Sequence, residues 1–321
     1  ESWGCRIFCV TPQRVNIFRY IKEVNKIIKE GNYGIVHNHQ HFRGVISLYL
    51  AKKNKVPNRI AHCHIVATTE NHISKTIRYI LIKLLKRFAT HWFACGIMAG
   101  KWLYGEKAYN NGKVQIMNNA IDTKKFGYNE TTRNEVRKAL NLVGKTVIGN
   151  VARFTYQKNH EFLLKVFAQI YYKNKDALLL LVGDGELEKD VRKQVSDFDI
   201  DNAVIFLGAR NDVNELMQAM DVFLLPSRFE GLPVVLVEAQ CTGLKCIVSD
   251  KITEEINVTN NITYVPLDYP PEKWAEIVLN NIHYVRTDNS DLVRANGYDI
   301  YYEAKKLENL YNTMVQETSF K

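Results

Sequence analysis

The sequence predicts an α/β protein built from two doubly wound, Rossmann-like domains. Short β-branched or apolar runs alternate with amphipathic helical stretches along almost the whole chain of 321 residues. Such alternation is typical of parallel sheets joined by right-handed helical crossovers. The length is sufficient for two domains, each with its own hydrophobic core. We therefore expect one domain at 1–143 and a second at 144–321.

The first half of the chain contains five expected strands and three expected helices. Apolar residues three and four positions apart predict helices, and short runs rich in β-branched residues predict strands. The strands are Arg6–Val10, Ile35–His37, Arg59–His62, Trp92–Cys95 and Val114–Met117. The helices are Asn16–Lys29, Val45–Lys53 and Ser74–Phe88.

The second half continues the same pattern. Its expected strands are Thr146–Val151, Leu178–Val182, Val204–Leu207, Val222–Leu225 and Cys246–Val248. Its expected helices are Asn159–Tyr172, Glu186–Ser196, Val213–Ala219 and Pro233–Cys241. Because ligands of such sheets bind at the carboxyl ends of the strands, we look for function in the residues that follow each strand.

The net charge changes sign near the expected domain boundary. Residues 1–143 carry 24 Lys and Arg against 8 Asp and Glu, a net charge of +16, whereas residues 144–321 carry 19 against 26, a net charge of −7. A basic half can bind nucleic acid or an anionic membrane surface. Alternatively, its charges form a solvated surface that binds no partner. The helix at Ser74–Phe88 pairs five Lys and Arg with an apolar stripe. That pattern favours the membrane over nucleic acid, although an ordinary helix packed on the sheet is the alternative.

Cysteine usage and the apolar runs indicate the compartment. The six cysteines are scattered, with no Cys-x-x-Cys pair, which is typical of reduced thiols in a cytosol. The first ten residues lack the basic start and apolar run of a secretory signal. No apolar run reaches the ~18 residues of a membrane span. We expect a cytoplasmic protein held peripherally at the inner face of the plasma membrane.

Two common nucleotide-binding motifs are excluded. Gly144-Lys145-Thr146 looks like the end of a P-loop, but Ala139 stands where the first glycine is required. Gly183-Asp184-Gly185 begins a dinucleotide fingerprint, but Glu188 stands where the third glycine belongs.

The most informative segment is Pro226–Ala239, where a strand ends, a glycine turn follows and a helix begins at Pro233. Proline suits the first turn of a helix, and the unpaired N–H groups there suit an anion. Glu230 lies in the turn, and Glu238 lies eight positions later in the helix. Two carboxylates so placed suit the hydroxyl groups of a sugar and a ribose. The alternative is a capped helix with two solvated acids.

This segment resembles the Glu-x7-Glu signature of family 4 of the retaining GT-B glycosyltransferases, also described as glycosyl transferases group 1. Further stretches between Ile35 and Ala239 are similar to the same family in order and spacing. They are Arg59–His64, Asn118–Asp122, Arg153–His160, Val182–Leu187 and Phe206–Gly208. The resemblance implies an acceptor-side domain and a donor-binding domain facing each other across a cleft, with the last helix packing back on the first domain. It is greatest to capsule and exopolysaccharide enzymes.

The resemblance also implies roles for single residues. Arg153 and Lys158 would hold the donor diphosphate and offset the charge that grows on it. Glu230 would orient the donor sugar, and Glu238 the ribose. The remaining residues expected to contact the nucleotide are Gly183, Gly185, Leu207, Gly208, Gly231, Leu232, Pro233 and Val234.

Five histidines follow two of the expected strands. His37, His39 and His41 alternate after one strand, and His62 and His64 after the next, so a metal site is one interpretation. The resemblance favours His64 as the residue that approaches the donor sugar, with His62 as the alternative. Satisfied core histidines are the third interpretation. Because the family uses Arg, Lys and helix dipoles in place of a divalent ion, we expect no metal and no other cofactor.

The expected reaction is transfer of a sugar from a UDP-sugar to a hydroxyl of a lipid-linked saccharide or growing polysaccharide, with retention at the anomeric carbon. The family begins with a strand and a glycine-rich loop that this sequence does not show, so we expect the first domain to lack them. The rival interpretations are a GT-B sugar-nucleotide epimerase, a metal-dependent hydrolase and an inactive carbohydrate-binding remnant.

Overall fold

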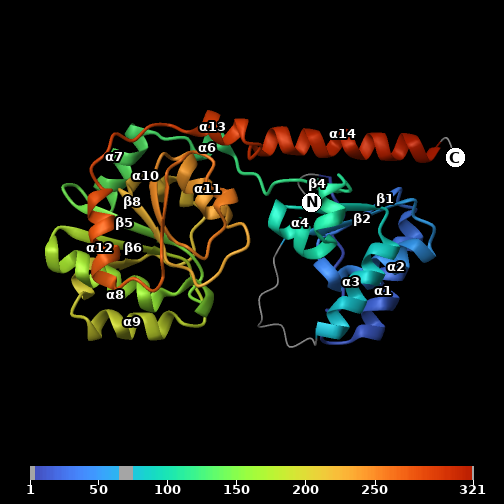
Figure 1. Ribbon diagram of the computed structural model, residues 1–321, viewed down its shortest axis with the longest axis horizontal. Helices are drawn as coiled ribbons and strands as arrows, with labels where there is room; N and C mark the ends of the chain where they lie inside the picture. The colour runs from blue at the N-terminus through green and yellow to red at the C-terminus, as the bar shows by residue number, and fades with distance from the viewer. Residues whose placement is uncertain (1–3, 65–74, 320–321) are drawn as a thin grey trace. The chain divides into compact units, whose positions relative to one another are not determined.

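The computed structural model describes residues 4–64 and 75–319. It divides into two compact units (Figure 1). Unit 1 contains the residues up to Asn118 together with those from Ala304 onward, and unit 2 contains Asn119–Glu303. Both units are α/β with a parallel sheet, as the alternation of strands and helices predicts.

Unit 1 is built on a four-stranded parallel sheet in the order β1-β2-β3-β4. Its strands are β1 (Ile35–Asn38), β2 (Asn58–Cys63), β3 (His91–Ala94) and β4 (Val114–Ile116). Its helices are α1 (Ile17–Gly31), η1 (His41–Gly44), α2 (Val45–Lys53), α3 (Lys75–Phe88), α4 (Ile97–Tyr104), α5 (Glu106–Asn110) and the part of α14 (Ile300–Ser319) from Ala304 on.

Successive side chains of a strand point to opposite faces of the sheet, and both faces of this sheet are covered by helices. Val36 of β1 packs with Ile28 of α1 and Leu50 of α2 on one face. Ile35 packs with Ile60 and Phe93 on the other face, which α14 covers. The residues of α14 in this contact are Leu307, Leu310, Tyr311 and Met314.

The expected strand Arg6–Val10 does not form. The segment is irregular, with Ile7 68% and Phe8 50% exposed. It lines a hollow together with α1, and Thr11 N donates to Glu23 Oε2 of that helix at 2.6 Å. A strand is stable only where its N–H and C=O groups pair with a neighbour, and no such pairing is found for this segment in the described part of the chain.

Unit 2 is built on a six-stranded parallel sheet in the order β10-β9-β8-β5-β6-β7. Its strands are β5 (Thr146–Val151), β6 (Ala177–Val182), β7 (Val204–Phe206), β8 (Val222–Leu225), β9 (Lys245–Ser249) and β10 (Ile262–Val265). Its helices are α6 (Thr123–Phe126), α7 (Glu130–Ala139), η2 (Tyr156–Lys158), α8 (His160–Lys173), α9 (Glu188–Asp197), η3 (Asp201–Ala203), α10 (Val213–Ala219), α11 (Val234–Cys241), η4 (Glu254–Ile256), α12 (Pro271–Asn280), α13 (Ser290–Ala295) and the start of α14.

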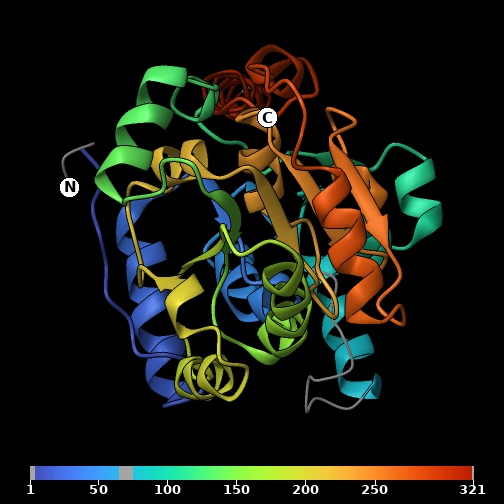
Figure 2. The same cartoon turned by 90° about the vertical axis from the view of Figure 1, so that its left-hand side faces the viewer.

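A separate hydrophobic core lies on each face of this sheet. Helices α8, α9 and α12 pack on one face, around Ile148 and Trp274. Helices α10, α11 and α13 pack on the other, around Val147 and Phe223 (Figures 1 and 2). Val147 and Ile148 are neighbours in β5 and point to opposite faces, so this strand contributes side chains to both cores.

The units divide at Asn119, not at 143/144 as the change in charge predicts. Helix α7 belongs to unit 2 because Arg133 and Arg137 both pair with Asp221, the residue before β8. The same guanidinium groups donate to carbonyl oxygens at the end of α10. Cations at the carboxyl end of a helix satisfy its unpaired carbonyls and offset its dipole. Basic residues near the expected boundary are therefore structural parts of the second unit.

The other expected strands are found with shifts of a residue or two at their ends. The expected helix Ser74–Phe88 corresponds to α3, which begins at Lys75, and Ser74 lies outside the described residues. Among the helices that the structure describes, none combines the length and the apolar character needed to cross a bilayer.

Candidate functional site

The candidate site lies at the carboxyl ends of β5 and β8 in unit 2. These two strands are neighbours in the sheet, and the helices that follow them, α8 and α11, pack on opposite faces. Open α/β sheets bind their ligands at such a topological switch point. The loops at this point are 152–159 after β5 and 226–233 after β8.

Lys158 and Glu230, one from each loop, form an ion pair. Lys158 Nζ lies 2.6 Å from Glu230 Oε1, and the two side chains are 18% and 5% exposed. Ser227 Oγ donates to the same oxygen at 2.7 Å, and Gln157 Nε2 donates to Oε2 at 2.9 Å. Three donors therefore hold the carboxylate, while the ammonium has three N–H groups and uses one of them here. The sequence does not predict that Gln157 and Ser227 donate hydrogen bonds to this carboxylate.

Buried polar side chains fix the loop after β8. Asn150, Asn159 and Ser249 each donate a side-chain hydrogen bond to a carbonyl oxygen between Leu224 and Ser227, at 2.6 to 3.0 Å. The three donors are buried. Sequence reasoning misses them because their partners are main-chain atoms far away in the chain. The asparagine at position 159 is the one signal in the sequence, because asparagine tolerates a left-handed backbone better than most residues and Asn159 has φ 58°.

The Gly183-Asp184-Gly185 turn packs against the loop after β5. A Cβ atom at Gly183 would lie 2.1 Å from Ala152 O, and one at Gly185 would lie 2.5 Å from Phe154 O. Both glycines have positive φ, 138° and 154°. Glycine is required here because two backbones approach closely. This turn therefore fixes the loop that carries Lys158, while its contact with a nucleotide stays a prediction.

Gly208 and Leu207 follow β7 at the same edge of the sheet. Gly183 N donates to Gly208 O at 2.8 Å, and Leu207 N donates to Leu181 O at 2.9 Å. Gly208 has φ 66°, and a Cβ atom there would meet nothing within 4 Å. The space beside Gly208 is open, and the contact of this turn with a base stays a prediction.

Gly231, Leu232 and Pro233 lead into α11, whose first residue is Val234. Within the described part of the chain no side chain caps this helix, so its first N–H groups and the positive end of its dipole are available to an anion. Glu238, in the second turn, is half-buried and has no side-chain hydrogen bond or ion pair within the described residues. Burial raises the pKa of Glu238 to about 7, so its charge changes near neutral pH.

Arg153, two residues beyond β5, is exposed. Its guanidinium makes no ion pair or side-chain hydrogen bond in the part of the chain that the structure describes. The structure therefore brings Lys158 and Glu230 into contact and leaves Arg153 available to bind an anion.

The five histidines expected after the first strands, His37, His39, His41, His62 and His64, lie in unit 1, where His64 follows β2. Burial, with a smaller effect of neighbouring histidines, lowers the pKa of His37 to about 3, of His41 to about 4 and of His62 to about 2. These rings are therefore neutral at neutral pH. The role of His64 toward a donor sugar stays a prediction.

Comparison with known proteins identifies the family. Residues 132–276 match the family described as glycosyl transferases group 1. The chain is 33% identical over 325 residues to EpsF of Bacillus subtilis (strain 168), which is named as a glycosyltransferase, and the match covers 98% of this chain and 85% of EpsF. The chain belongs to the glycosyl transferases group 1 family. A second relative in Escherichia coli, UDP-Gal:alpha-D-GlcNAc-diphosphoundecaprenol alpha-1,3-galactosyltransferase, is 28% identical over 303 residues, covering 90% of this chain and 78% of that protein.

The fold is shared with solved structures. HepE of Anabaena, in complex with UDP and glucose, matches with a TM-score of 0.76 at 18% identity, covering 96% of this chain and 85% of that chain. The fold is the GT-B fold of two parallel-sheet α/β units, which confirms the predicted fold class. This group 1 protein is an enzyme, a glycosyltransferase.

Proposed function

We propose that this glycosyltransferase moves a sugar from a UDP-sugar to a hydroxyl group of a lipid-linked saccharide or growing polysaccharide, with retention at the anomeric carbon. The observation that carries the proposal is the Lys158–Glu230 pair at the switch point of the unit 2 sheet. Two relatives support the substrate classes. The Escherichia coli enzyme is named for a UDP-sugar and a diphosphoundecaprenol-linked acceptor, and HepE was solved with UDP.

The donor diphosphate would bind between the two loops. Lys158 contributes the N–H groups that Glu230 does not use, and Arg153 contributes an exposed guanidinium. The amino end of α11 adds main-chain N–H groups and a partial positive charge. Negative charge grows on the diphosphate as the anomeric bond breaks, and these fixed donors stabilise it.

The carboxylates would select the sugar and the nucleoside. Glu230 is held by Lys158, Ser227 and Gln157, so its remaining lone pairs have a fixed direction toward a donor sugar. Glu238 has no competing partner in the described structure, which suits it to accept the hydroxyl groups of the ribose. The open turn at Gly208 would lie beside the base.

The way in which Glu230 is bound argues against a covalent intermediate on this residue. It is the only carboxylate in the loops 152–159 and 226–233. Three hydrogen bonds tie it in place and oppose its use as a nucleophile or as a base. We therefore assign the chemistry to stabilisation of the leaving diphosphate, with no covalent nucleophile.

A peripheral membrane location is part of the proposal. The apolar side of α3 is not fully packed, because Ile77 is 53%, Ile80 50% and Leu84 37% exposed. Helices α1, α2 and α3 together line an apolar hollow that includes Tyr49 and Leu84. Exposed apolar side chains beside the lysines and arginines of α3 suit the surface of an anionic bilayer.

The test is product analysis with a panel of nucleotide sugars and lipid-linked saccharide acceptors, read by mass spectrometry. We expect acceptor extended by one sugar and release of UDP, and a large loss of both with Glu230→Gln. A new UDP-sugar formed without acceptor would instead identify an epimerase. Free sugar formed without acceptor would identify a hydrolase. Saccharide binding without any turnover would identify an inactive remnant.

A further inference from the structure

Five histidines gather at the carboxyl ends of β1 and β2 in unit 1. In the pairing of these strands, His37 lies opposite Ile60. Side chains at every second position share a face, so His37 and His39 lie on the same side of the sheet as His62 and His64. The tertiary structure thus joins two sets of histidines that the sequence separates by more than twenty residues.

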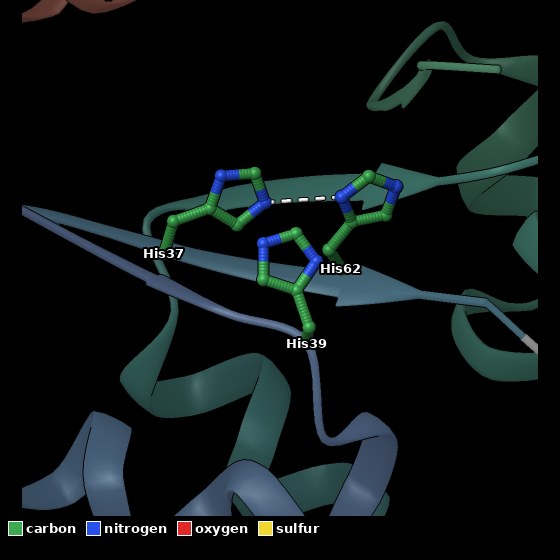
Figure 3. Close-up of side chains that lie close together, drawn as sticks. All are labelled: His37, His39 and His62. Carbon is green, nitrogen blue, oxygen red and sulfur yellow. Dashed lines mark hydrogen bonds between the residues drawn. The ribbon is translucent and has the colours of Figure 1, made fainter. Parts of the chain in front are cut away.

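Three of these rings converge. Ligand nitrogens of His37, His39 and His62 all lie within 4.8 Å of one another. His37 Nε2 is 3.0 Å from His62 Nδ1, and Figure 3 shows the ring of His39 lying against that contact. Ring centroids of His37 and His39 are 4.2 Å apart. Imidazole nitrogens that converge in this way form a donor set that a transition metal ion can bind.

Other groups fix the outward nitrogens of two of the rings. Tyr311 Oη on α14 lies 2.5 Å from His37 Nδ1, and His64 Nε2 lies 2.7 Å from His39 Nδ1. Hydrogen bonds of this kind orient metal-binding histidines and direct the opposite nitrogen to the ion. His62 is 4% exposed, and its Nε2 has no hydrogen-bond partner among the residues that the structure describes, so that nitrogen can carry the ring proton while Nδ1 faces the cluster.

We propose that His37, His39 and His62 bind one divalent late first-row transition metal ion, for which Zn²⁺ is the probe. Three imidazoles are a ligand set that such ions prefer, whereas Mg²⁺ and Ca²⁺ prefer oxygen. His39 is exposed and His62 is buried, so an ion can enter from the side of His39. The proposal is independent of the proposed sugar transfer and revises the sequence expectation that no metal is bound.

The geometry needs only a small adjustment. Zn–N bonds of ~2.0–2.1 Å in a tetrahedral site separate ligand nitrogens by roughly 3.3 Å. His37 Nε2 and His62 Nδ1 are 3.0 Å apart, and the ligand nitrogens of all three histidines lie within 4.8 Å of one another. Rotations of the imidazole rings that shorten the longer nitrogen–nitrogen distances by about an ångström would complete the site. A fourth position would remain for water or another ligand.

The experiment is calorimetric titration of tag-free, chelator-treated protein with ZnCl₂. We expect one Zn²⁺ per chain, and His39→Ala should weaken the affinity by roughly 100-fold or more. The matched control is His283→Ala, which removes an exposed histidine of unit 2 and should bind Zn²⁺ as the wild type does. Tyr311→Phe keeps all three ligands and should weaken binding by about 10–100-fold.

Two results would overturn the proposal. One is wild-type protein that takes up no Zn²⁺ at a single site. The other is His39→Ala with wild-type affinity, which moves the ion elsewhere. Because His39 is exposed, its replacement leaves the core intact, and circular dichroism checks that each variant is folded.

Discussion

The carboxyl ends of the two sheets carry different chemistry on the same parallel architecture. In unit 2 a buried carboxylate meets an ammonium, at Glu230 and Lys158. In unit 1 the same position of the sheet holds five imidazoles. Burial penalises charge in both places, raising the pKa of Glu238 to about 7 and lowering that of His62 to about 2.

The difference shows what a buried polar site needs in order to be stable. Opposite charges in contact can both remain in a desolvated place, whereas groups of one kind remain there only in the neutral form. The unit 2 site is therefore suited to a charged ligand such as a diphosphate. The unit 1 cluster is suited to a ligand that accepts neutral nitrogen donors.

The largest expected effect is that of Lys158→Ala. The change removes a donor from the diphosphate and leaves Glu230 buried without its counter-ion. We expect kcat/KM for sugar transfer to fall by roughly 10²–10³-fold and UDP affinity to fall by about 1.5–3 kcal/mol. Lys165→Ala, which removes an exposed lysine of α8 paired with Glu161, is the control for assay and calorimetry.

A double variant separates a direct effect of Lys158 from its effect through Glu230. Residues that act as a unit are not additive, so Glu230→Gln should cost much less activity in the Lys158→Ala protein than in the wild type. Glu230→Gln alone should lower turnover and leave UDP affinity unchanged. If the activity losses of the two single variants were fully additive in the double variant, Lys158 and Glu230 would not act as a unit.

The next effect concerns the backbone beneath the ion pair. Gly183→Ala would bring a Cβ atom to 2.1 Å from Ala152 O at a φ of 138°, so we expect the free energy of unfolding to fall by about 2–4 kcal/mol. Gly208→Ala shares the positive φ but meets nothing within 4 Å, and should cost only about 1–2 kcal/mol. Urea unfolding of both variants measures the difference, and equal costs would mean that close approach is not the reason for glycine at Gly183.

Glu238 tests the effect of burial on a single carboxyl. A carboxyl whose pKa is raised by folding contributes stability that is present below its unfolded pKa and is lost as pH rises through about 7. Glu238→Gln removes that loss, so the variant should gain roughly 2 kcal/mol relative to wild type between pH 5 and pH 8. The exposed Glu186→Gln should show no such trend in urea unfolding.

Glu238→Gln should also change the affinity for UDP. If the ionised carboxylate accepts the ribose hydroxyls, UDP affinity of the wild type should increase as pH rises through about 7, and that of Glu238→Gln should be weaker and independent of pH. A pH-independent affinity in the wild type would remove Glu238 from the ribose.

The smallest expected effect is at the membrane. We expect the protein to sediment with phosphatidylglycerol vesicles at low salt and to be released by high salt, since each nearby Lys or Arg contributes about 1 kcal/mol. Ile80→Ser should weaken binding by about 1 kcal/mol at every salt concentration, because Ile80 is 50% exposed on α3. Val285→Ser, on the 88% exposed Val285 of unit 2, is the control. Equal binding to neutral vesicles would argue against a basic membrane surface.

The sequence by itself determines the fold class, most of the strands and the segments that carry the site. These follow from patterns within a few residues, such as the alternation in β5 and the turn before Pro233, and local patterns are visible in one chain. The Arg6–Val10 segment shows the limit, because an apolar run becomes a strand only when another strand pairs with it.

The tertiary structure alone decides which of these segments meet. The contact between Lys158 and Glu230 spans 72 residues, and the one between His37 and Tyr311 spans 274. Neither is encoded in a local pattern, because each depends on strand order and on the packing of α14. The same reason explains why the boundary at Asn119 is not visible in the charge balance, since Arg133 and Arg137 find their partner Asp221 more than eighty residues later.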